Sequence, residues 1–387
     1  MTWLIVFSHL RWSFVYQRTQ HLISRLARHY PVLYIEEPVP GRGPARFDVV
    51  PQGPNLDVLV PHTPVGAPGF HDDPMARLGP MLASHLGSHG IDDWVAWFNT
   101  PMALPLLADL APRAIVCDCI DEPAAFDRAP HRPREREAAL LDIADLVLTA
   151  GPARFESKRR CNANTHCVPS SVDAAHFSPS CLDPANAEAL AAERLHADAR
   201  RPRLGCFGVI DARIDLALLA TLADRHPEWQ VLMVGPIVNT DPATLPQRPN
   251  LHWLGPQPHA RLPYLLAGWD LCLMPFLIDA TTRAVNPTQA LEYMAGAKPV
   301  VSTPVPDVIA LYGDTVRIGS AADGSFVVAC EQALAEARPQ RDRRVGAMLD
   351  TVQRASWDRA ADTVHGLIEA VLAARPAVAG RRQPIGR

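Results

Sequence analysis

Short runs of β-type residues alternate with amphipathic helical stretches along most of the chain, and this alternation limits the fold more than any other feature. The runs are a few residues long and rich in Val, Ile, Leu and aromatic residues, as buried parallel strands are. In the first half, the expected strands are Leu4–Phe7, Val32–Ile35, Trp94–Phe98, Ala114–Cys117, Leu146–Thr149 and His166–Val168. Helical patterns at 17–30 and 135–144 lie between them. This order predicts a mostly parallel sheet with helices on both faces.

The alternation stops at Ser178 and resumes at Arg203. The segment between them is rich in Ala, Arg and Pro and has no strand pattern, which is typical of a connection between domains. The strands expected after it are 203–208, 230–234, 251–254, 271–274 and 299–302, with helices near 215–225 and 262–268. Because 387 residues exceed what one core normally organises, we expect two domains. The fold class is therefore α/β, with two Rossmann-like domains whose parallel sheets face a central cleft.

The expected division follows from these breaks. It comprises an amino-terminal Rossmann-like domain (1–177), a connection (178–202), a carboxyl-terminal Rossmann-like domain (203–355), a helix that could return to the first domain (356–375) and a disordered tail (376–387). The Pro-, Gly- and His-rich region that holds His62, His71, His85 and His89 has no metal-ligand spacing, and we interpret it as loop.

Charge and motif content exclude several functions. The 37 Lys and Arg residues against 41 Asp and Glu residues give a net charge of −4, so we expect no nucleic-acid partner. The two lysines, Lys158 and Lys298, do not stand in a Gly-Lys-Ser/Thr context, which excludes a P-loop. The loop after the first strand, 8–13, lacks the glycines of a dinucleotide site. Eight cysteines without a C-x-x-C pair predict reduced thiols and no metal.

Two apolar stretches bear on membrane association. The run Met1–Phe7 has no charged n-region and is broken by Ser8, His9 and Arg11, so we interpret it as a first strand rather than a signal peptide. The run Leu265–Ile278 is interrupted by Gly268, Asp270 and Pro275 and is too short to cross a bilayer. We therefore expect a cytoplasmic protein, with peripheral association at the inner membrane face as an option.

A helix start in the second half predicts an anion site. Asn286 followed by Pro287 favours a helix that begins there and ends near Gly296, because Asn caps free N–H groups and Pro fits the first helical position. The N–H groups of Thr288 and Gln289 would then face the cleft at the positive end of the helix dipole. A diphosphate fits such a site.

Charged residues near this helix extend the hypothesis. Arg213 follows the first strand of the second domain and Arg283 precedes the cap, and both could neutralise a diphosphate. Glu292 stands six positions into the helix, ~9 Å along its axis, within reach of ribose hydroxyls. Each residue also has a plain structural alternative: Asn-Pro starts many helices, Arg213 could pair with Asp211 or Asp215, and a helical Glu is usually solvated.

The first half offers acceptor and catalytic candidates. His9, Arg11, Trp12, Arg18 and His21 lie in the loop after the first strand and the start of the next helix, where an acceptor could bind and Trp12 could stack on a sugar. The alternative is that Trp12 and His21 belong to the core.

The strand Ala114–Cys117 is followed by Asp118, Asp121 and Glu122, so a carboxylate is expected at its carboxyl end. Such a group could act as a general base on an acceptor hydroxyl if the reaction inverts configuration. The catalytic candidates are Asp118, Asp121 and His9. The alternative for Asp118 is helix capping or loop stabilisation.

The segment Leu291-Glu-Tyr-Met-Ala-Gly-Ala-Lys-Pro-Val-Val-Ser-Thr303 resembles the donor-site signature of group 1 (family 4-like) glycosyltransferases of the GT-B fold. Further similar segments are 12–21, 117–122, 167–177, 205–213 and 234–237. The subgroup implied is the bacterial one that makes capsule, exopolysaccharide or teichuronic-acid-type polymers.

The resemblance implies transfer of a sugar from a nucleotide-diphosphate donor to a hydroxyl of a saccharide or lipid-linked acceptor, without metal or cofactor and with retention. Glu292 would be the second glutamate of the E-x7-E signature and bind the ribose, and Arg213 would bind phosphate. The sequence departs from the pattern at Ala284, where the first glutamate falls, and at Gln289, where a phosphate-binding lysine is expected.

Other functions stay open, and these departures favour the first of them. A catalytically degenerate GT-B protein could act as a scaffold or regulator of polysaccharide assembly. A hexosyl epimerase or a phosphorylase could use the same fold, although no convincing pyridoxal-phosphate lysine supports the phosphorylase.

Overall fold

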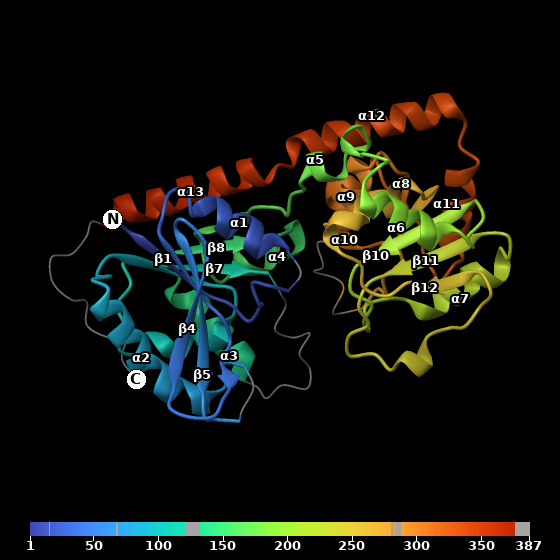
Figure 1. The fold of residues 1–387 in the computed structure, drawn as a ribbon. Helices are drawn as coiled ribbons and strands as arrows, with labels where there is room; N and C mark the ends of the chain where they lie inside the picture. Colours follow the sequence, from blue (N-terminus) through green and yellow to red (C-terminus); the bar gives the residue numbers. More distant parts are fainter. Residues whose placement is uncertain (15, 67–68, 121–131, 280–281, 283–287, 376–387) are drawn as a thin grey trace. The chain divides into compact units, whose positions relative to one another are not determined.

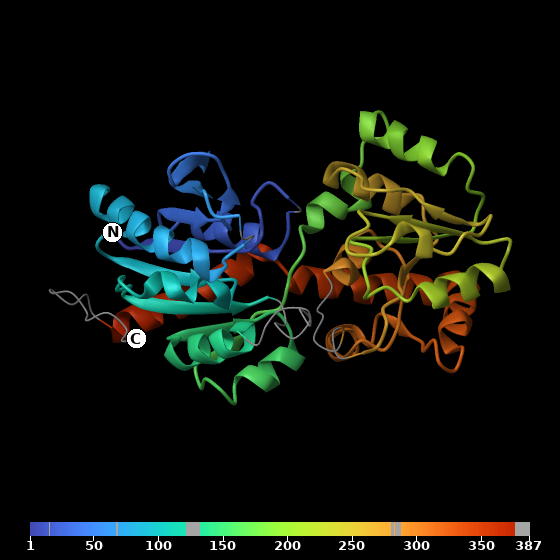
Figure 2. The same ribbon diagram turned by 90° about the horizontal axis from the view of Figure 1, so that it is seen from below.

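The computed structural model describes residues 1–14, 16–66, 69–120, 132–279, 282 and 288–375. The chain divides into two compact units (Figures 1 and 2). The first unit comprises Met1–Pro169 and the chain from Asp358 on, and the second comprises Ser170–Trp357. Each unit is an α/β structure built around its own mostly parallel sheet.

The first unit contains a sheet of nine described strands. They are β1 (Trp3–Phe7), β2 (Val32–Ile35), β3 (Val39–Pro40), β4 (Arg46–Gly53), β5 (Leu56–Thr63), β6 (Trp94–Phe98), β7 (Ala114–Cys119), β8 (Leu146–Thr149) and β9 (Thr165–Cys167). The helices are α1 (Arg18–Leu26), α2 (Asp72–Ser88), the 3-10 helix η1 (Pro101–Leu107), α3 (Arg132–Ile143), α4 (Pro152–Lys158) and α13 (Trp357–Ala374), which belongs to this unit from Asp358 on.

The order of the first sheet is β3-β5-β2-β1-β6-β7-β8-β9, and β4 pairs with β5. The β4–β5 pair is antiparallel, whereas the other described pairs are parallel. Since β2 and β6 flank β1 on opposite sides, the strand order reverses at β1 and β6. In a doubly wound sheet this reversal is where the loops part and ligands bind.

Helices cover both faces of the first sheet (Figures 1 and 2). α2, η1 and α3 bury one face together with the side chains of Ile5, Phe7 and Leu33. α1 and α13 lie on the other face, where the Tyr30 hydroxyl donates to a Glu369 carboxylate oxygen at 2.6 Å. Arg113 donates to the backbone oxygen of Leu372 at 2.9 Å, so residues that precede β2 and β7 both hold α13.

The interpretation of the His-rich region as loop is wrong. His62 lies in β5 and His85 in α2, while His71 caps the amino end of α2 and His89 follows its last residue. The error has a physical cause. Prolines and glycines stand inside α2, and a proline precedes His62 in β5, and such residues usually mark turns and loops.

The second unit contains a sheet of six described strands. They are β10 (Arg203–Phe207), β11 (Gln230–Val234), β12 (Leu251–Trp253), β13 (Leu271–Met274), β14 (Val300–Ser302) and β15 (Arg317–Ile318). The helical segments are α5 (Ala174–Phe177), η3 (Pro179–Cys181), α6 (Ala187–His196), α7 (Leu216–Arg225), η4 (Pro242–Thr244), η5 (His259–Arg261), α8 (Leu262–Ala267), α9 (Gln289–Ala295), α10 (Pro306–Tyr312), α11 (Ser325–Leu334) and α12 (Arg338–Arg354).

The second sheet has the order β12-β11-β10-β13-β14-β15, and its described pairings are parallel. Numbered within the unit, this is 3-2-1-4-5-6, the Rossmann order. The order reverses between β10 and β13, so the ligand crevice of this fold belongs at their carboxyl ends. The predicted strands of both halves are confirmed to within two residues of their ends.

The segment expected to connect the domains is part of the second unit. Ala192 and Ala199 of this segment are buried in the core of that unit, and so are Val172 and Phe177, which were predicted to belong to the first domain. α6 therefore packs as a structural helix, and the first unit ends at Pro169 rather than at residue 177.

Candidate functional site

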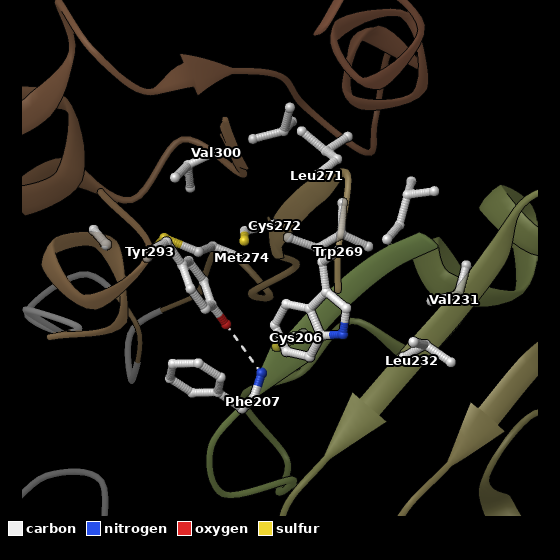
Figure 3. Close-up of a cluster of buried hydrophobic side chains, with 14 of the residues drawn as sticks. Cys206, Phe207, Val231, Leu232, Trp269, Leu271, Cys272, Met274, Tyr293 and Val300 are labelled. Carbon is white, nitrogen blue, oxygen red and sulfur yellow. Dashed lines mark hydrogen bonds between the residues drawn. The ribbon is translucent and has the colours of Figure 1, made fainter. Parts of the chain in front are cut away.

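The carboxyl ends of β10 and β13 separate at the reversal point of the second sheet. The two strands pair at Leu204↔Leu271 and Gly205↔Cys272. Further along β10, the backbone N–H of Phe207 donates to the Tyr293 hydroxyl of α9 at 2.9 Å (Figure 3). A side chain at Gly205 would overlap the Trp269 ring, so glycine lets this tryptophan pack against the strand. α9 thus closes one side of the gap between the strands.

Gln289 makes a second contact between α9 and β10. Its Nε2 donates to the backbone oxygen of Phe207 at 2.8 Å. Gln289 and Tyr293 are four residues apart and share one face of the helix, so both polar groups of Phe207 bond to α9. Gly208, at φ +134°, accommodates the Gln289 amide, which a Cβ there would overlap. The Gln289 amide thus holds the helix against β10. A contact between Gln289 and a nucleotide-sugar donor stays a prediction.

Glu292 lies on α9 and is partly exposed. Its carboxylate has no hydrogen bond or ion pair with any described residue. Desolvation by the protein atoms packed around it raises the pKa of Glu292 from 4.5 to about 7. A carboxyl group in this state carries accessible oxygens that no described residue engages. It can accept hydrogen bonds from the hydroxyls of a ligand.

Arg213 lies in the loop after β10 and forms a bidentate pair with Asp211. Its Nε lies 2.9 and 3.0 Å from the two Asp211 oxygens, and its Nη2 lies 2.7 Å from Oδ2. The alternative of pairing with Asp211 is therefore confirmed. The Arg213 side chain is still 40% exposed, so an anion can reach the guanidinium at the cost of sharing it with a carboxylate.

Backbone contacts bring the loops after β10 and β13 together. The N–H of Leu277 donates to the Arg213 oxygen at 2.8 Å, and the N–H of Asp215 donates to the Pro275 oxygen at 2.8 Å. Asp215 also caps α7 through the N–H of Leu218. These contacts position Arg213 on the same edge of the sheet as α9.

Several predicted donor residues fall outside the described part of the chain. Arg283 and Asn286 are among them, as is Pro287, where the helix was predicted to start. Thr288 has helical dihedral angles and directly precedes α9, and Gly296 follows the helix as predicted. The capping of this helix by Asn286 and its anion site therefore stay predictions.

The first unit places Arg18 and Asp118 in a buried ion pair. Arg18 Nη2 lies 3.0 Å from Asp118 Oδ1, and the side chains are 7% and 0% exposed. Arg18 Nη1 donates to the Val168 oxygen at 2.7 Å, and Asn99 Nδ2 approaches Asp118 Oδ2 at 3.5 Å. Asp118 stands inside β7 rather than after it. The catalytic and acceptor roles of this pair stay predictions, while Asp121 lies outside the described residues.

The loop after β1 is tied to the end of β2. The Glu36 carboxylate accepts from Arg11 Nη1 at 2.8 Å and from the backbone N–H of Trp12 at 2.7 Å. The Trp12 ring meets the Tyr34 ring edge to face, with centroids 5.0 Å apart. Trp12, Arg11 and His9 are each partly exposed, so they lie at the surface of the first unit's sheet edge.

Sequence reasoning missed Glu36, Asn99 and the contacts of Phe207. Glu36 and Asn99 directly follow β2 and β6, the same signal that singled out Asp118. The bonds of Phe207 are made by its backbone, and no side-chain pattern marks them.

The described residues contain neither a cluster of potential metal ligands nor a membrane-spanning helix. Within them, no group of three or more His, Cys, Asp or Glu side chains is arranged to hold a metal. Likewise, none of the helices in that part of the chain combines the length and apolarity needed to span a membrane.

Comparison with known proteins identifies the class of the second unit. Residues 201–338 match the family model of glycosyl transferases group 1. This range includes β10 to β15 and α9, which build the reversal point. The second unit is therefore similar to group 1 glycosyltransferases over this range, in agreement with the resemblance noted in the sequence.

A curated relative agrees with this class. The chain is 29% identical over 138 residues to TuaH of Bacillus subtilis (strain 168), whose name assigns it to teichuronic acid biosynthesis as a glycosyltransferase. The alignment covers 34% of this chain and 35% of TuaH. It thus spans about a third of the relative's length.

Solved structures share the fold along nearly the whole chain. Sucrose-phosphate synthase of Thermosynechococcus elongatus has a TM-score of 0.73 at 17% identity, with 97% of this chain and 100% of that chain covered. Anabaena Alr3699/HepE, solved with UDP and glucose, has a TM-score of 0.67 at 14% identity, with 96% and 100% covered. The protein therefore has the GT-B fold.

Proposed function

We propose that the protein is a glycosyltransferase that moves a sugar from a nucleotide-diphosphate donor to a hydroxyl of an acceptor. The proposal rests on one coincidence. The residues that match the group 1 family build the reversal point of the second sheet, and Glu292 stands there with a carboxylate that no described residue engages. A sheet edge of this kind is where α/β folds bind nucleotides.

Glu292 is assigned to the ribose of the donor. Its carboxylate accepts hydrogen bonds from the vicinal hydroxyls, and ligand binding stabilises the ionised form that desolvation disfavours. Arg213 and Arg283 are assigned to the diphosphate, with Asn286, Thr288 and Gln289 at the helix start. UDP is the first donor base to test, because HepE was solved with UDP and an E. coli protein of similar fold was solved with UDP-2-fluoro glucose.

The acceptor is assigned to the first unit, and the product to a surface polysaccharide. The name of TuaH supports this polymer class, with a saccharide or lipid-linked acceptor. We place the reaction in the cytoplasm or at the inner membrane face, without metal and with retention of configuration. In a retaining reaction the departing phosphate oxygen takes the acceptor proton, so Asp118 is not needed as a base.

A scaffold or regulatory function is the second candidate, and two observations favour it. Gln289 stands where a lysine is expected, and its amide donates to the Phe207 oxygen. Arg213 is paired with Asp211. Such a protein would bind a nucleotide without transferring sugar.

Calorimetry with UDP, GDP and ADP tests the donor assignment. Native protein should bind one of them, and Glu292→Ala should weaken that binding by about tenfold, as expected for one or two lost hydrogen bonds to a charged group. The matched control is Asp350→Asn, which removes an exposed carboxylate on α12 and should leave binding unchanged. Binding of none of the three nucleotides contradicts both candidates.

Transfer assays separate the two candidates. Donor hydrolysis or transfer to any member of a broad acceptor panel establishes the enzyme. Nucleotide binding with neither reaction establishes the scaffold.

A further inference from the structure

A cavity opens in the second unit, away from the reversal point. It has a volume of about 620 Å³ and lies between α6, α8 and the loop before them. Its wall includes Arg203, the first residue of β10, whereas the donor site adjoins Phe207, the last. The two residues are ~13 Å apart along the strand. The volume is that of a small-molecule site, ~300–1,000 Å³.

One wall of the cavity holds a histidine whose ring makes no hydrogen bond with a described residue. His196 is 5% exposed, and among the described residues neither of its ring nitrogens has a hydrogen-bond partner. Gly268 makes room for the ring, because a Cβ there would overlap it. Burial, followed by repulsion from Arg203, lowers the pKa of His196 to about 4. The imidazole is therefore neutral near pH 7, with one N–H donor and one acceptor nitrogen.

Other polar groups at the cavity point to an uncharged ligand. The Arg203 guanidinium donates hydrogen bonds to the backbone oxygens of Ala199, at 2.6 Å, and His196, at 3.0 Å. Glu193 stands exposed at the rim. The Glu193 carboxylate would repel an anion, and the Arg203 guanidinium that could attract one is already bonded to backbone oxygens. The same guanidinium would repel a cation. The two formal charges cancel, which favours a neutral ligand.

The remaining wall combines an aromatic ring with small apolar groups. Tyr264 is partly exposed, and its hydroxyl has no hydrogen-bond partner among the described residues. Leu182, Pro184 and Ala267 supply apolar surface. A sugar ring has an apolar C–H face that packs on an aromatic side chain, and hydroxyls that both donate and accept. We propose that this cavity binds a neutral saccharide unit, with its ring against Tyr264 and its hydroxyls bonded to His196 and Glu193.

The saccharide could be a free sugar or a unit of a polymer chain, and the second source rests on the proposed function. Saturation-transfer NMR on the full chain distinguishes them. The probes are glucose, galactose and N-acetylglucosamine, each as the free sugar and as an oligosaccharide, with UDP present in excess. Tighter binding of the oligosaccharide assigns a polymer, and equal binding assigns the free sugar.

Variants locate the binding. Glu193→Gln and Tyr264→Phe each remove one hydrogen-bonding group and keep the shape of the side chain, and each should weaken saccharide binding ~fivefold. Arg194→Gln is the matched control, because Arg194 is exposed on the same helix and is not among the residues that line the cavity. Unfolding midpoints confirm that the variants fold.

Three results overturn the proposal: no saturation transfer to any probe, loss of the signal when UDP is added, or equal binding by native protein and both cavity variants. Nucleotide binding is measured on the same samples. The samples can therefore bind saccharide without binding nucleotide, or nucleotide without saccharide. These two results distinguish a failure of the proposed function from a failure of the cavity proposal.

Discussion

The two sheets reverse their strand order in the same way, yet their polar residues at the carboxyl edge are used differently. In the first unit, Asp118 is paired with Arg18, and Glu36 accepts from Arg11. In the second unit, Glu292 has no partner among the described residues. The sequence drew attention to Asp118 as a carboxylate expected at the end of a strand and to Glu292 as a carboxylate within a helix that starts at the cleft. The difference teaches that the partners of a charged group, more than its position, separate a structural role from a binding role.

Breaking the buried pair of the first unit should give the largest effect. Asp118→Ala leaves the Arg18 guanidinium buried and unpaired, and we expect a loss of about 3–5 kcal/mol in the free energy of unfolding. Urea unfolding measures it. The double variant Arg18→Met with Asp118→Leu removes both charges and should recover most of the loss. If Asp118→Asn abolished sugar transfer without lowering stability, Asp118 would be catalytic and the comparison would fail.

Removing the charge of Glu292 should have a pH-dependent effect of about 2–3 kcal/mol. The folded protein holds the Glu292 proton up to about pH 7, whereas the unfolded chain releases it near the ordinary value of 4.5. The native protein therefore loses stability as pH rises from 4.5 to 7, and Glu292→Gln does not. The variant should gain roughly 2–3 kcal/mol over native protein between pH 5 and pH 8 in urea titrations.

Asp350→Asn serves as the control for this titration, since its carboxylate is exposed. It should show no such gap. If Glu292→Gln were no more stable than native protein at any pH in this range, the Glu292 carboxyl would be solvated like a surface group.

Restoring a cation at position 289 should sharpen the comparison by strengthening the donor site. Gln289→Lys adds a charge beside the expected diphosphate, worth about 1.5 kcal/mol or a tenfold tighter nucleotide Kd. The lysine amine can still donate to the Phe207 oxygen that Gln289 Nε2 now contacts. Calorimetry measures the change, and Gln289→Met is the uncharged control. Equal affinity of the lysine variant and native protein would place the phosphates elsewhere.

An exposed ion pair in the first unit should give the smallest effect. Asp358 pairs with Arg25 and Arg28, and its side chain is 55% exposed. These two arginines lower the pKa of Asp358 against the opposing effect of desolvation, which raises it. Because solvent screens the pair, Asp358→Asn should cost less than about 1 kcal/mol by thermal unfolding. A loss as large as that of Asp118→Ala would remove the distinction between buried and exposed pairs.

The sequence predicted the inner strands well because burial marks them directly. β1, β2, β6 and β10 to β14 are short apolar runs between turns, and their ends follow the prediction closely. The edge strand β4 was not predicted, because its exposure on both faces leaves it without an alternation of apolar and polar residues. α6 also escaped, since its buried Ala192 and His196 are not a recognisable apolar stripe.

The candidate site was predicted only as far as side chains reveal it. The family signature located Glu292 and the end of α9 at Gly296. The pairing of Arg213 with Asp211 depends on loop geometry, and the two hydrogen bonds between α9 and Phe207 depend on backbone groups. A sequence pattern records neither.

A crystal of the full chain soaked with UDP, GDP and ADP in turn tests the central claim most directly. The account predicts electron density for one nucleotide at the carboxyl ends of β10 and β13, with its ribose hydroxyls within hydrogen-bonding distance of the Glu292 carboxylate. Density at another edge of the molecule, or Glu292 turned away from a bound nucleotide, would contradict it.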